Sequence, residues 1–250
     1  MLRERCTPFS AALALHVRPH PREEAEQETD MSPLTGLWAT PDGSAVGPAR
    51  VRTQVMVPMQ FADGFQTTAE VTTFHGLADG REHLALRLGQ PVDVALVRPH
   101  SECMTGDVFG SKRCDCGPQL REAAERITEA GGYLLYLRQE GRGIGLYEKM
   151  DAYALQDTGL DTYAANRAIG QPDDLRDYRV VAQMLDALGV GTVDLLTNNP
   201  DKVQQLTELG VDVRDVIATG VHLSPANRRY LDAKVQHTGH TIELPPGIAV

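Results

Sequence analysis

Alternating apolar and polar positions begin near residue 52 and predict three β-strands, over residues 53–59, 67–74 and 83–88. The pairs Asp63-Gly64 and Asp79-Gly80 interrupt these runs, and an Asp-Gly pair between alternating runs is typical of a hairpin turn. We therefore expect the folded part of the chain to begin with an antiparallel meander.

After residue 118 the pattern changes to helices and buried strands. Residues 119–130 carry apolar or small side chains at helical spacing and end at Gly131-Gly132, and the apolar run 133–137 follows as a buried strand. The alternation continues over residues 178–188, 192–196, 203–209 and 211–216. We predict an α/β or mixed α+β fold, in which N-terminal β-hairpins are followed by alternating helices and strands around a mixed sheet.

Residues 1–50 show no sustained apolar period and contain Pro-rich, Glu-rich and Gly/Ser-rich patches. Such a segment cannot bury enough apolar surface to offset the entropy of ordering it. We expect a disordered extension over residues 1–50, with Met31 as an alternative start, a folded domain over 51–244 and a flexible tail over 245–250.

Charge and hydropathy narrow the choice of partners. The formal net charge is −10, which disfavours a nucleic-acid partner because nucleic-acid binding needs a basic face. No apolar run approaches the roughly 20 residues of a membrane span, so we expect no membrane partner and a cytoplasmic protein with reduced thiols. An anionic ligand would need a local group of basic residues, for which the candidates are Arg98, Arg113, Arg142, Arg176 and Lys202.

Three of the four cysteines lie in one short segment, at Cys103, Cys114 and Cys116. Packing in the core does not explain them, because the charged Asp115 separates two of the thiols. Clustered thiols in a reducing compartment usually bind metal, and three protein ligands leave an open zinc position that can activate a water molecule. The alternative is a closed structural site, whose fourth ligand would have to be Cys6.

A glycine-rich run follows the strand predicted over residues 133–137 and reads Arg138-Gln139-Glu140-Gly141-Arg142-Gly143-Ile144-Gly145. Glycines let backbone amides approach a ligand closely, a helix start after them favours an anion, and arginines can fork onto a phosphate. The run is equally compatible with a plain turn from strand to helix.

Polar residues also follow the strand predicted over residues 192–196. Thr197 comes directly after it, and Pro200 suits the first position of a helix. Asn198 could act as the cap of that helix. Thr197 and Lys202 could then face a phosphate or a base at the carboxyl end of the strand.

Taken together, these segments resemble GTP cyclohydrolase II. The resemblance rests on residues 98–120, 138–145, 152–157 and 195–202, and it extends in order over residues 52–243. It implies that the chain opens the imidazole ring of GTP, releases formate and pyrophosphate and forms a diaminopyrimidine ribosyl phosphate, the first step of riboflavin biosynthesis. It also implies one Zn²⁺ per chain, Mg²⁺ with the GTP phosphates, and a homodimer.

The resemblance assigns ligands to individual residues. Cys103, Cys114 and Cys116 match the zinc ligands, with the open position holding water for attack on C8 of the guanine ring. The residues that match GTP contacts are Arg98, Pro99, His100, Ser101, Glu102, Gln119, Glu140, Gly141, Arg142, Thr162, Thr197 and Lys202.

Three further residues match the catalytic groups of the family. Asp174 matches the proton acceptor, Arg176 the nucleophile toward the α-phosphate, and Tyr153 a tyrosine associated with full turnover. A guanidinium has a pKa above about 12, so Arg176 is a poor nucleophile unless a base such as Asp174 acts with it. An electrostatic clamp is the alternative role for Arg176.

Other functions fit some of the same residues. His100 and Glu102 match one half of the zinc nucleobase deaminase signature, but the other half has two residues between its cysteines, whereas Cys114 and Cys116 have one. A second alternative is a GTP ring-opening enzyme of a specialised pathway that retains the formyl group. A third is a non-catalytic, zinc-stabilised binding module.

Overall fold

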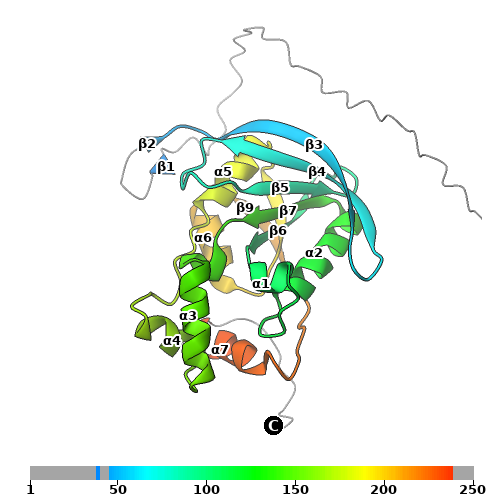
Figure 1. The fold of residues 1–250 in the computed structure, drawn as a ribbon. Helices are drawn as coiled ribbons and strands as arrows, with labels where there is room; N and C mark the ends of the chain where they lie inside the picture. Colours follow the sequence, from blue (N-terminus) through cyan, green and yellow to red (C-terminus); the bar gives the residue numbers. More distant parts are fainter. Residues whose placement is uncertain (1–37, 40–44, 239–250) are drawn as a thin grey trace, which may run out of the picture. The chain divides into compact units, whose positions relative to one another are not determined.

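The computed structural model describes residues 38–39 and 45–238, which belong to the unit formed by residues 33–250 (Figure 1). Most of the extension predicted over residues 1–50, and all of the tail predicted over 245–250, lie outside the described residues. Within the extension, β1 (Trp38–Ala39) pairs antiparallel with β2 (Ala45–Val46), and Ala49 is buried in the core. Regular structure therefore begins before the first strand that the sequence predicts.

The predicted antiparallel meander is confirmed. β3 (Arg50–Gln60), β4 (Gln66–His75) and β5 (Leu84–Leu88) pair in this order. Gly64, in the turn between the first two strands, has a φ of 92°, a conformation that suits glycine. Among the described strands, β3 pairs in this sheet with β4 alone, so the meander forms one margin of the sheet.

The predicted mixed sheet is also confirmed, because the meander continues into a set of parallel strands. The strand order is β3-β4-β5-β7-β6-β8-β9, in which β5 and β7 are antiparallel and the last four strands are mutually parallel. These four strands are β6 (Ala95–Ser101), β7 (Gly132–Leu137), β8 (Thr192–Leu196) and β9 (Asp212–Ile217).

The sequence pattern does not predict β6, although the strand is buried along almost its whole length. Arg98, Pro99 and His100 break its apolar pattern, and proline is unfavourable in a central strand because it lacks an N–H donor. Pairing with β8 ends at Val97, and the Pro99 carbonyl accepts a hydrogen bond from Lys202 Nζ at 2.8 Å. Pro99 is therefore tolerated where the strand leaves its neighbour.

Helices connect and cover the strands. The helix predicted over residues 119–130 is α2 (Cys116–Ala130), which begins three residues earlier than predicted. α5 (Arg179–Ala187) and α6 (Pro200–Glu208) follow the predicted pattern. The remaining helices are α1 (Met104–Asp107), the 3₁₀-helix η1 (Glu140–Gly143), α3 (Leu146–Asp157), α4 (Thr162–Ala168) and α7 (Arg228–Thr238). α4 packs against both α3 and α7, in the lower part of Figure 1. Among the described residues, no helix is long and apolar enough to cross a membrane.

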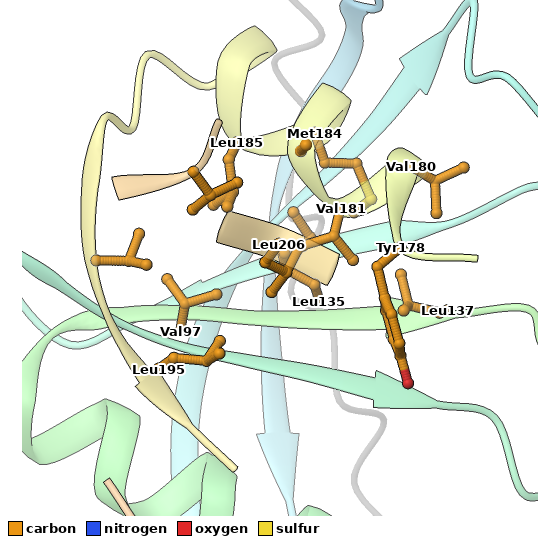
Figure 2. Close-up of a cluster of buried hydrophobic side chains, with 14 of the residues drawn as sticks. Val97, Leu135, Leu137, Tyr178, Val180, Val181, Met184, Leu185, Leu195 and Leu206 are labelled. Atoms are coloured by element: carbon orange, nitrogen blue, oxygen red, sulfur yellow. The ribbon is translucent and has the colours of Figure 1, made fainter. Parts of the chain in front are cut away.

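The parallel strands are rich in apolar residues because both faces of this part of the sheet are covered. On one face, Val97, Leu135 and Leu195 are buried with α5 and α6 (Figure 2). On the other face, Leu96 and Leu134 are buried with α2. Successive side chains of a strand point to opposite faces, so the same short strands supply both halves of the core.

Gly132 sets the separation of the two central strands. It follows the glycine that ends α2 and has a φ of 155°. A Cβ on Gly132 would lie 2.0 Å from the carbonyl oxygen of Leu96 in β6. That oxygen belongs to the backbone of a central strand, so it cannot move aside without disturbing the sheet.

Replacing Gly132 by alanine should therefore destabilise the protein strongly. We expect Gly132→Ala to lower the free energy of unfolding, measured with urea, by at least about 3 kcal/mol through backbone strain and overpacking together. Gly191→Ala is the matched control, because a Cβ there has no atom within 4 Å, and it should change stability by less than about 1 kcal/mol. Equal unfolding midpoints for the two variants would contradict this account.

Candidate active site

The carboxyl ends of β6, β7 and β8 border one pocket, in the position where open α/β sheets bind ligands. Side chains of α3, α4 and α7 complete its lining. Tyr153 and Arg176 line the pocket, and Asp174 contacts Arg176 from outside the lining. The residues expected to bind zinc or GTP all line it: Arg98, Pro99, His100, Ser101, Glu102, Cys103, Cys114, Cys116, Gln119, Glu140, Gly141, Arg142, Thr162, Thr197 and Lys202.

Three thiols gather on one wall of the pocket. Cys103 follows β6, Cys116 is the first residue of α2, and Cys114 directly precedes the cap of that helix, Asp115. The three Sγ atoms lie within 4.8 Å of one another, and those of Cys103 and Cys114 are 3.6 Å apart. Sulfur ligands of tetrahedral zinc are separated by about 3.8 Å, since each Zn–S bond is about 2.3 Å long. Cys6, required by the closed-site alternative, lies outside the described residues.

The thiols also influence one another electrostatically. Hydrogen bonds from Cys114 and Cys116, together with the charge of Lys149, hold the pKa of Cys103 far below its usual value. The bond to Cys103 in turn raises the pKa of Cys114 to about 11, and both neighbouring sulfurs raise the pKa of Cys116. One thiolate therefore keeps its neighbours protonated. All three can ionise together only around a cation, so this donor set fits a zinc ion.

Two glycines allow the thiols to approach one another. A Cβ on Gly106 of α1 would lie 2.8 Å from Cys114 Sγ and 3.1 Å from Cys103 Sγ. A Cβ on Gly117 would lie 2.5 Å from the carbonyl oxygen of Gly106. Any larger residue at either position would push α1 away from the first turn of α2 and separate the sulfurs.

Asp107 fixes the turn that carries Cys103. Its carboxylate, 2% exposed, lies 3.1 Å from His100 Nε2 and accepts hydrogen bonds from the Tyr136 hydroxyl at 2.9 Å and from the Cys103 N–H at 3.0 Å. The rings of His100 and Tyr136 are stacked, with centroids 5.7 Å apart. His100 therefore lines the pocket in an orientation that the buried carboxylate determines.

Glu140 is engaged by protein groups through both of its carboxylate oxygens. Oε2 accepts a hydrogen bond from the Met104 N–H at 2.7 Å, and Oε1 accepts from Lys149 Nζ at 2.8 Å and from the Gly141 N–H at 2.9 Å. Lys149 also donates to Cys103 Sγ at 3.2 Å. A side chain expected to contact GTP thus connects the glycine-rich run to the thiols.

Buried cations form another wall of the pocket. Arg98 and Lys202 are 7% and 4% exposed. Desolvation lowers the pKa of Lys202 well below its usual value, and the nearby charges of Arg98 and Arg176 lower it further. Arg98 Nε and Arg142 Nη1 are buried without a hydrogen-bond partner. An anionic ligand would relieve both the repulsion and the unmade hydrogen bonds, even in a chain of net charge −10.

Asp174 and Arg176 form a bidentate ion pair. Arg176 Nε donates to Asp174 Oδ1 at 2.9 Å, and Nη2 donates to Oδ2 at 2.5 Å. Burial opposes the charge of Arg176, but Tyr178 and Asp174 outweigh it and raise the pKa of Arg176 above its usual value. Burial also opposes the charge of Asp174, and the hydrogen bonds from Arg176 outweigh it and lower the pKa of Asp174. Both groups are charged at neutral pH.

The glycine-rich run has a left-handed backbone that distinguishes it from a plain turn. Gly141 and Arg142 have φ values of 63° and 60°, and Arg142 is the one non-glycine residue with positive φ in the described part of the chain. Its guanidinium lies 4.7 Å from the ring centroid of Tyr163, and its carbonyl accepts from the Leu175 N–H at 2.9 Å. The run therefore packs directly on segment 174–176, and strain of this kind is typical of functional sites.

Tyr153 lies on α3 next to two cations. The Arg113 guanidinium and Lys149 Nζ lie 4.6 Å and 5.7 Å from the centroid of its ring. Arg113 also forms an ion pair with Asp157, one turn further along α3. Burial raises the pKa of Tyr153, although Lys149 opposes the shift. The hydroxyl thus keeps its proton at neutral pH and can serve as a proton donor.

The loop after β8 differs in one detail from the prediction. Pro200 is the first residue of α6, as expected, but the helix cap is Asn199, whose side chain accepts from the Asp201 N–H at 3.1 Å. Asn198 is not the cap. It exchanges two hydrogen bonds of 2.9 Å with the backbone of Thr219, which ties the loops after β8 and β9 together.

Sequence reasoning missed several residues of the pocket. Lys149 lies one helical turn before Tyr153, and this spacing could have indicated it. Tyr230 and Lys234 of α7 also line the pocket. Lys234 Nζ donates to Asp115 Oδ1 at 2.8 Å, between two of the zinc-binding candidates in sequence. No local pattern signals α7, because its role depends on contacts across the fold.

The sequence of this chain is similar to those of known proteins. The model of the family described as GTP cyclohydrolase II matches residues 51–218. The chain belongs to the GTP cyclohydrolase II family. A protein named GTP cyclohydrolase-2 from Vibrio parahaemolyticus is 51% identical over 179 residues, which are 70% of this chain and 90% of that protein. Proteins of the same name from Psychromonas ingrahamii and Neisseria meningitidis are 47% and 49% identical and cover 78% and 68% of this chain, 98% and 89% of their own lengths.

Among solved structures, a two-domain 3,4-dihydroxy-2-butanone 4-phosphate synthase from A. baumannii matches 70% of this chain and 41% of its own. The identity is 19% and the TM-score 0.35, so this likeness supports no argument. The match to the GTP cyclohydrolase II family ends at residue 218, whereas α7 supplies pocket residues beyond it. The pocket of this chain therefore extends past the part matched to the family.

The fit of the thiols to zinc predicts the zinc content of the protein and the effects of substitutions at Cys114 and Gly106. Purified protein should carry about one zinc per chain, and Cys114→Ser should lose it because a serine hydroxyl does not ionise at neutral pH. Gly106→Ala, which leaves every ligand in place, should weaken zinc binding by about 10–100-fold in competition with a chromophoric chelator. Gly47→Ala is the control, because a Cβ there has no atom within 4 Å. Zinc affinity equal to that of the unmodified protein would show that Gly106 does not set the sulfur positions.

Proposed function

We propose that this chain uses zinc to open the imidazole ring of GTP, releasing formate and pyrophosphate and forming a diaminopyrimidine ribosyl phosphate. The protein is an enzyme of the GTP cyclohydrolase II family, and this is the reaction that begins riboflavin synthesis. The observation that carries the proposal is a single pocket that combines three thiols with buried cations. A purine ring and a triphosphate need these two environments within one site.

Cys103, Cys114 and Cys116 would hold the zinc ion. Three thiolates leave one coordination position open, and bound zinc supplies an activated water at neutral pH. The residues around the thiols maintain their positions: Gly106 lets the two segments approach, and Asp107 holds the Cys103 N–H.

Arg98, Arg142 and Lys202 are the residues that we assign to the anionic part of GTP. Arg98 and Lys202 are buried, as is Nη1 of Arg142, and this favours an anion over water because interactions with charge are stronger where water is excluded. Ser101 Oγ, like Arg98 Nε and Arg142 Nη1, is buried without a partner and could bond to a polar group of the nucleotide. Mg²⁺ would enter with the GTP phosphates, as is usual for nucleoside triphosphates.

Tyr153 is our candidate for the proton donor to the nitrogen that departs from C8 when formate is released from the opened ring. Its raised pKa keeps the hydroxyl protonated, and Arg113 beside the ring favours the anion formed after transfer. The tyrosine lies on α3, whereas Arg176 belongs to the segment before α5. Release of formate and loss of pyrophosphate would therefore use separate groups.

For Arg176 we favour an electrostatic clamp over a nucleophile. Its raised pKa and its bidentate bond to Asp174 both retain the proton that a nucleophile would have to lose. Both oxygens of Asp174 already accept from Arg176, so Asp174 acts mainly by orienting the guanidinium. A planar cation held in this way can stabilise negative charge on a phosphoryl group that is being transferred.

The catalytic unit would comprise residues 51–244, since α7 contributes Tyr230 and Lys234 to the pocket. Cys103, Cys114 and Cys116 are free among the described residues, which suits a reducing compartment such as the cytoplasm. We also propose a homodimer, as expected from the resemblance to the family.

The decisive experiment is to incubate the protein with GTP, Zn²⁺ and Mg²⁺ and to identify the products by mass. We expect formate, pyrophosphate and the diaminopyrimidine ribosyl phosphate in equal amounts, and no turnover after the metal is removed. A product that keeps the formyl group would favour the specialised ring-opening enzyme. Ammonia release would favour a deaminase, and binding without turnover a binding module.

The assigned roles predict that two substitutions fail differently. Tyr153→Phe should still release pyrophosphate but accumulate formylated product, whereas Arg176→Ala should block pyrophosphate release. Arg176→Lys keeps the charge but not the planar fork, so substantial recovery of the rate would support the clamp. A trapped phosphoryl adduct on Arg176 would instead support the nucleophile. Pyrophosphate release by Arg176→Ala at the unmodified rate would exclude both roles.

A further inference from the structure

Lys149 is a buried cation on α3 that no expectation from the sequence included. Its ammonium donates to Cys103 Sγ at 3.2 Å, to Thr105 Oγ1 at 3.1 Å and to Glu140 Oε1 at 2.8 Å. An ammonium has three N–H donors, so these contacts use all of them. Burying a lysine is costly unless it is fully paired, and here one of its partners is a candidate metal ligand.

The charge of the thiol cluster explains why a cation lies there. Three thiolates around one Zn²⁺ leave an excess negative charge, and most of that charge stays on the sulfur atoms. Lys149 offsets this excess at Cys103, while Glu140 prevents the ammonium from turning away. The second oxygen of Glu140 holds the Met104 N–H, next to Cys103 in sequence, so the lysine and the ligand turn share one anchor.

The helix also connects Lys149 to the reacting part of the pocket. Lys149 and Tyr153 are one turn apart on α3, so they lie on the same face of the helix. Lys149 Nζ lies 5.7 Å from the centroid of the Tyr153 ring. A change in the position of this ammonium would therefore affect both the metal ligand and the proposed proton donor.

We propose that Lys149 is a positioning residue of the zinc centre, which stabilises the Cys103 thiolate by a charge-assisted N–H···S hydrogen bond and connects it to Glu140. This inference rests on the zinc site of the proposed function. It assigns Lys149 a role in metal affinity and in the electronic properties of one sulfur ligand, rather than contact with GTP.

The test measures metal binding by the full-length protein and does not depend on turnover. Lys149→Met removes the charge and the donors at nearly constant length, Lys149→Gln keeps N–H donors without the charge, and Lys149→Arg keeps both. Lys112→Met is the matched control, because Lys112 is exposed in the same loop as Cys114. Each protein is titrated with Zn²⁺ against a chelator, and its Co²⁺ form is examined for the sulfur-to-cobalt charge-transfer band.

We expect Lys149→Met to weaken zinc binding by about 10–100-fold, the range typical for loss of a partner that orients a metal ligand. Its charge-transfer band should shift to longer wavelength, because a thiolate without a hydrogen bond gives up its electrons more easily. Lys149→Arg should recover most of both properties, and Lys112→Met should match the unmodified protein. If Lys149→Met does not fold, the glutamine variant tests the loss of the charge alone, and it should show the same changes to a smaller extent.

Two outcomes would overturn the inference. One is unchanged affinity and an unchanged band in the folded Lys149→Met or Lys149→Gln protein. The other is weaker affinity with an unmoved band that arginine does not restore, which would indicate packing alone. Failure of the proposed function looks different. If the zinc site is wrong, the unmodified protein binds no zinc at these thiols, and if only the reaction is wrong, it binds zinc without releasing formate and pyrophosphate from GTP.

Discussion

The thiol cluster of the pocket depends on holding three thiols from two segments within 4.8 Å of one another. Thiolates at this separation repel, so the fold must keep them together before any cation arrives. Gly106 removes the steric obstacle between the segments, and Asp107 anchors the turn after β6. The ion pair of Glu140 and Lys149 brings the glycine-rich run to the same place. The positions of His100 and α3 follow from these contacts.

The acidic and the basic groups of the pocket have different hydrogen-bond partners. Asp107, Asp115, Glu140 and Asp174 all accept several hydrogen bonds from protein donors, so they serve to position other groups. Donors on Arg98 and Arg142, in contrast, stay buried without partners. The carboxylates therefore orient the site while the unsatisfied cations favour an anionic ligand. This arrangement lets a chain of net charge −10 present a positive pocket.

β6 contributes residues both to the core of the sheet and to the lining of the pocket. Its first residues are apolar and fill the core between α2 and α5, whereas its last residues line the pocket. A central strand with Arg98, Pro99 and His100 is unfavourable by local propensity. It is acceptable here because the pairing of β6 with β8 ends at Val97, and the Pro99 carbonyl accepts a hydrogen bond from Lys202 instead. β6, which the sequence pattern did not predict, is thus the strand whose last residues line the pocket.

Local rules were sufficient wherever the deciding interactions are close in sequence. The period-two alternation and the Asp-Gly turns identified the meander, and the helical spacing before Gly131 identified α2. The spacing of Cys103, Cys114 and Cys116 identified the thiol cluster. Each of these depends on residues that are close together in the sequence, so the sequence contains the information directly.

Only the tertiary structure decided which distant residues complete the site. Lys149 reaches Cys103, Lys234 reaches Asp115, and Asn198 bonds to Thr219 rather than capping its own helix. Each choice depends on which partners the folded chain brings within hydrogen-bond distance, and a polar side chain alone does not indicate its partner. The sequence by itself therefore determined the thiol cluster and most other chemical groups of the site, together with the meander and α2, but not β6 or α7. The fold decided their pairing, because burial makes each unpaired charge or donor too costly to leave unsatisfied.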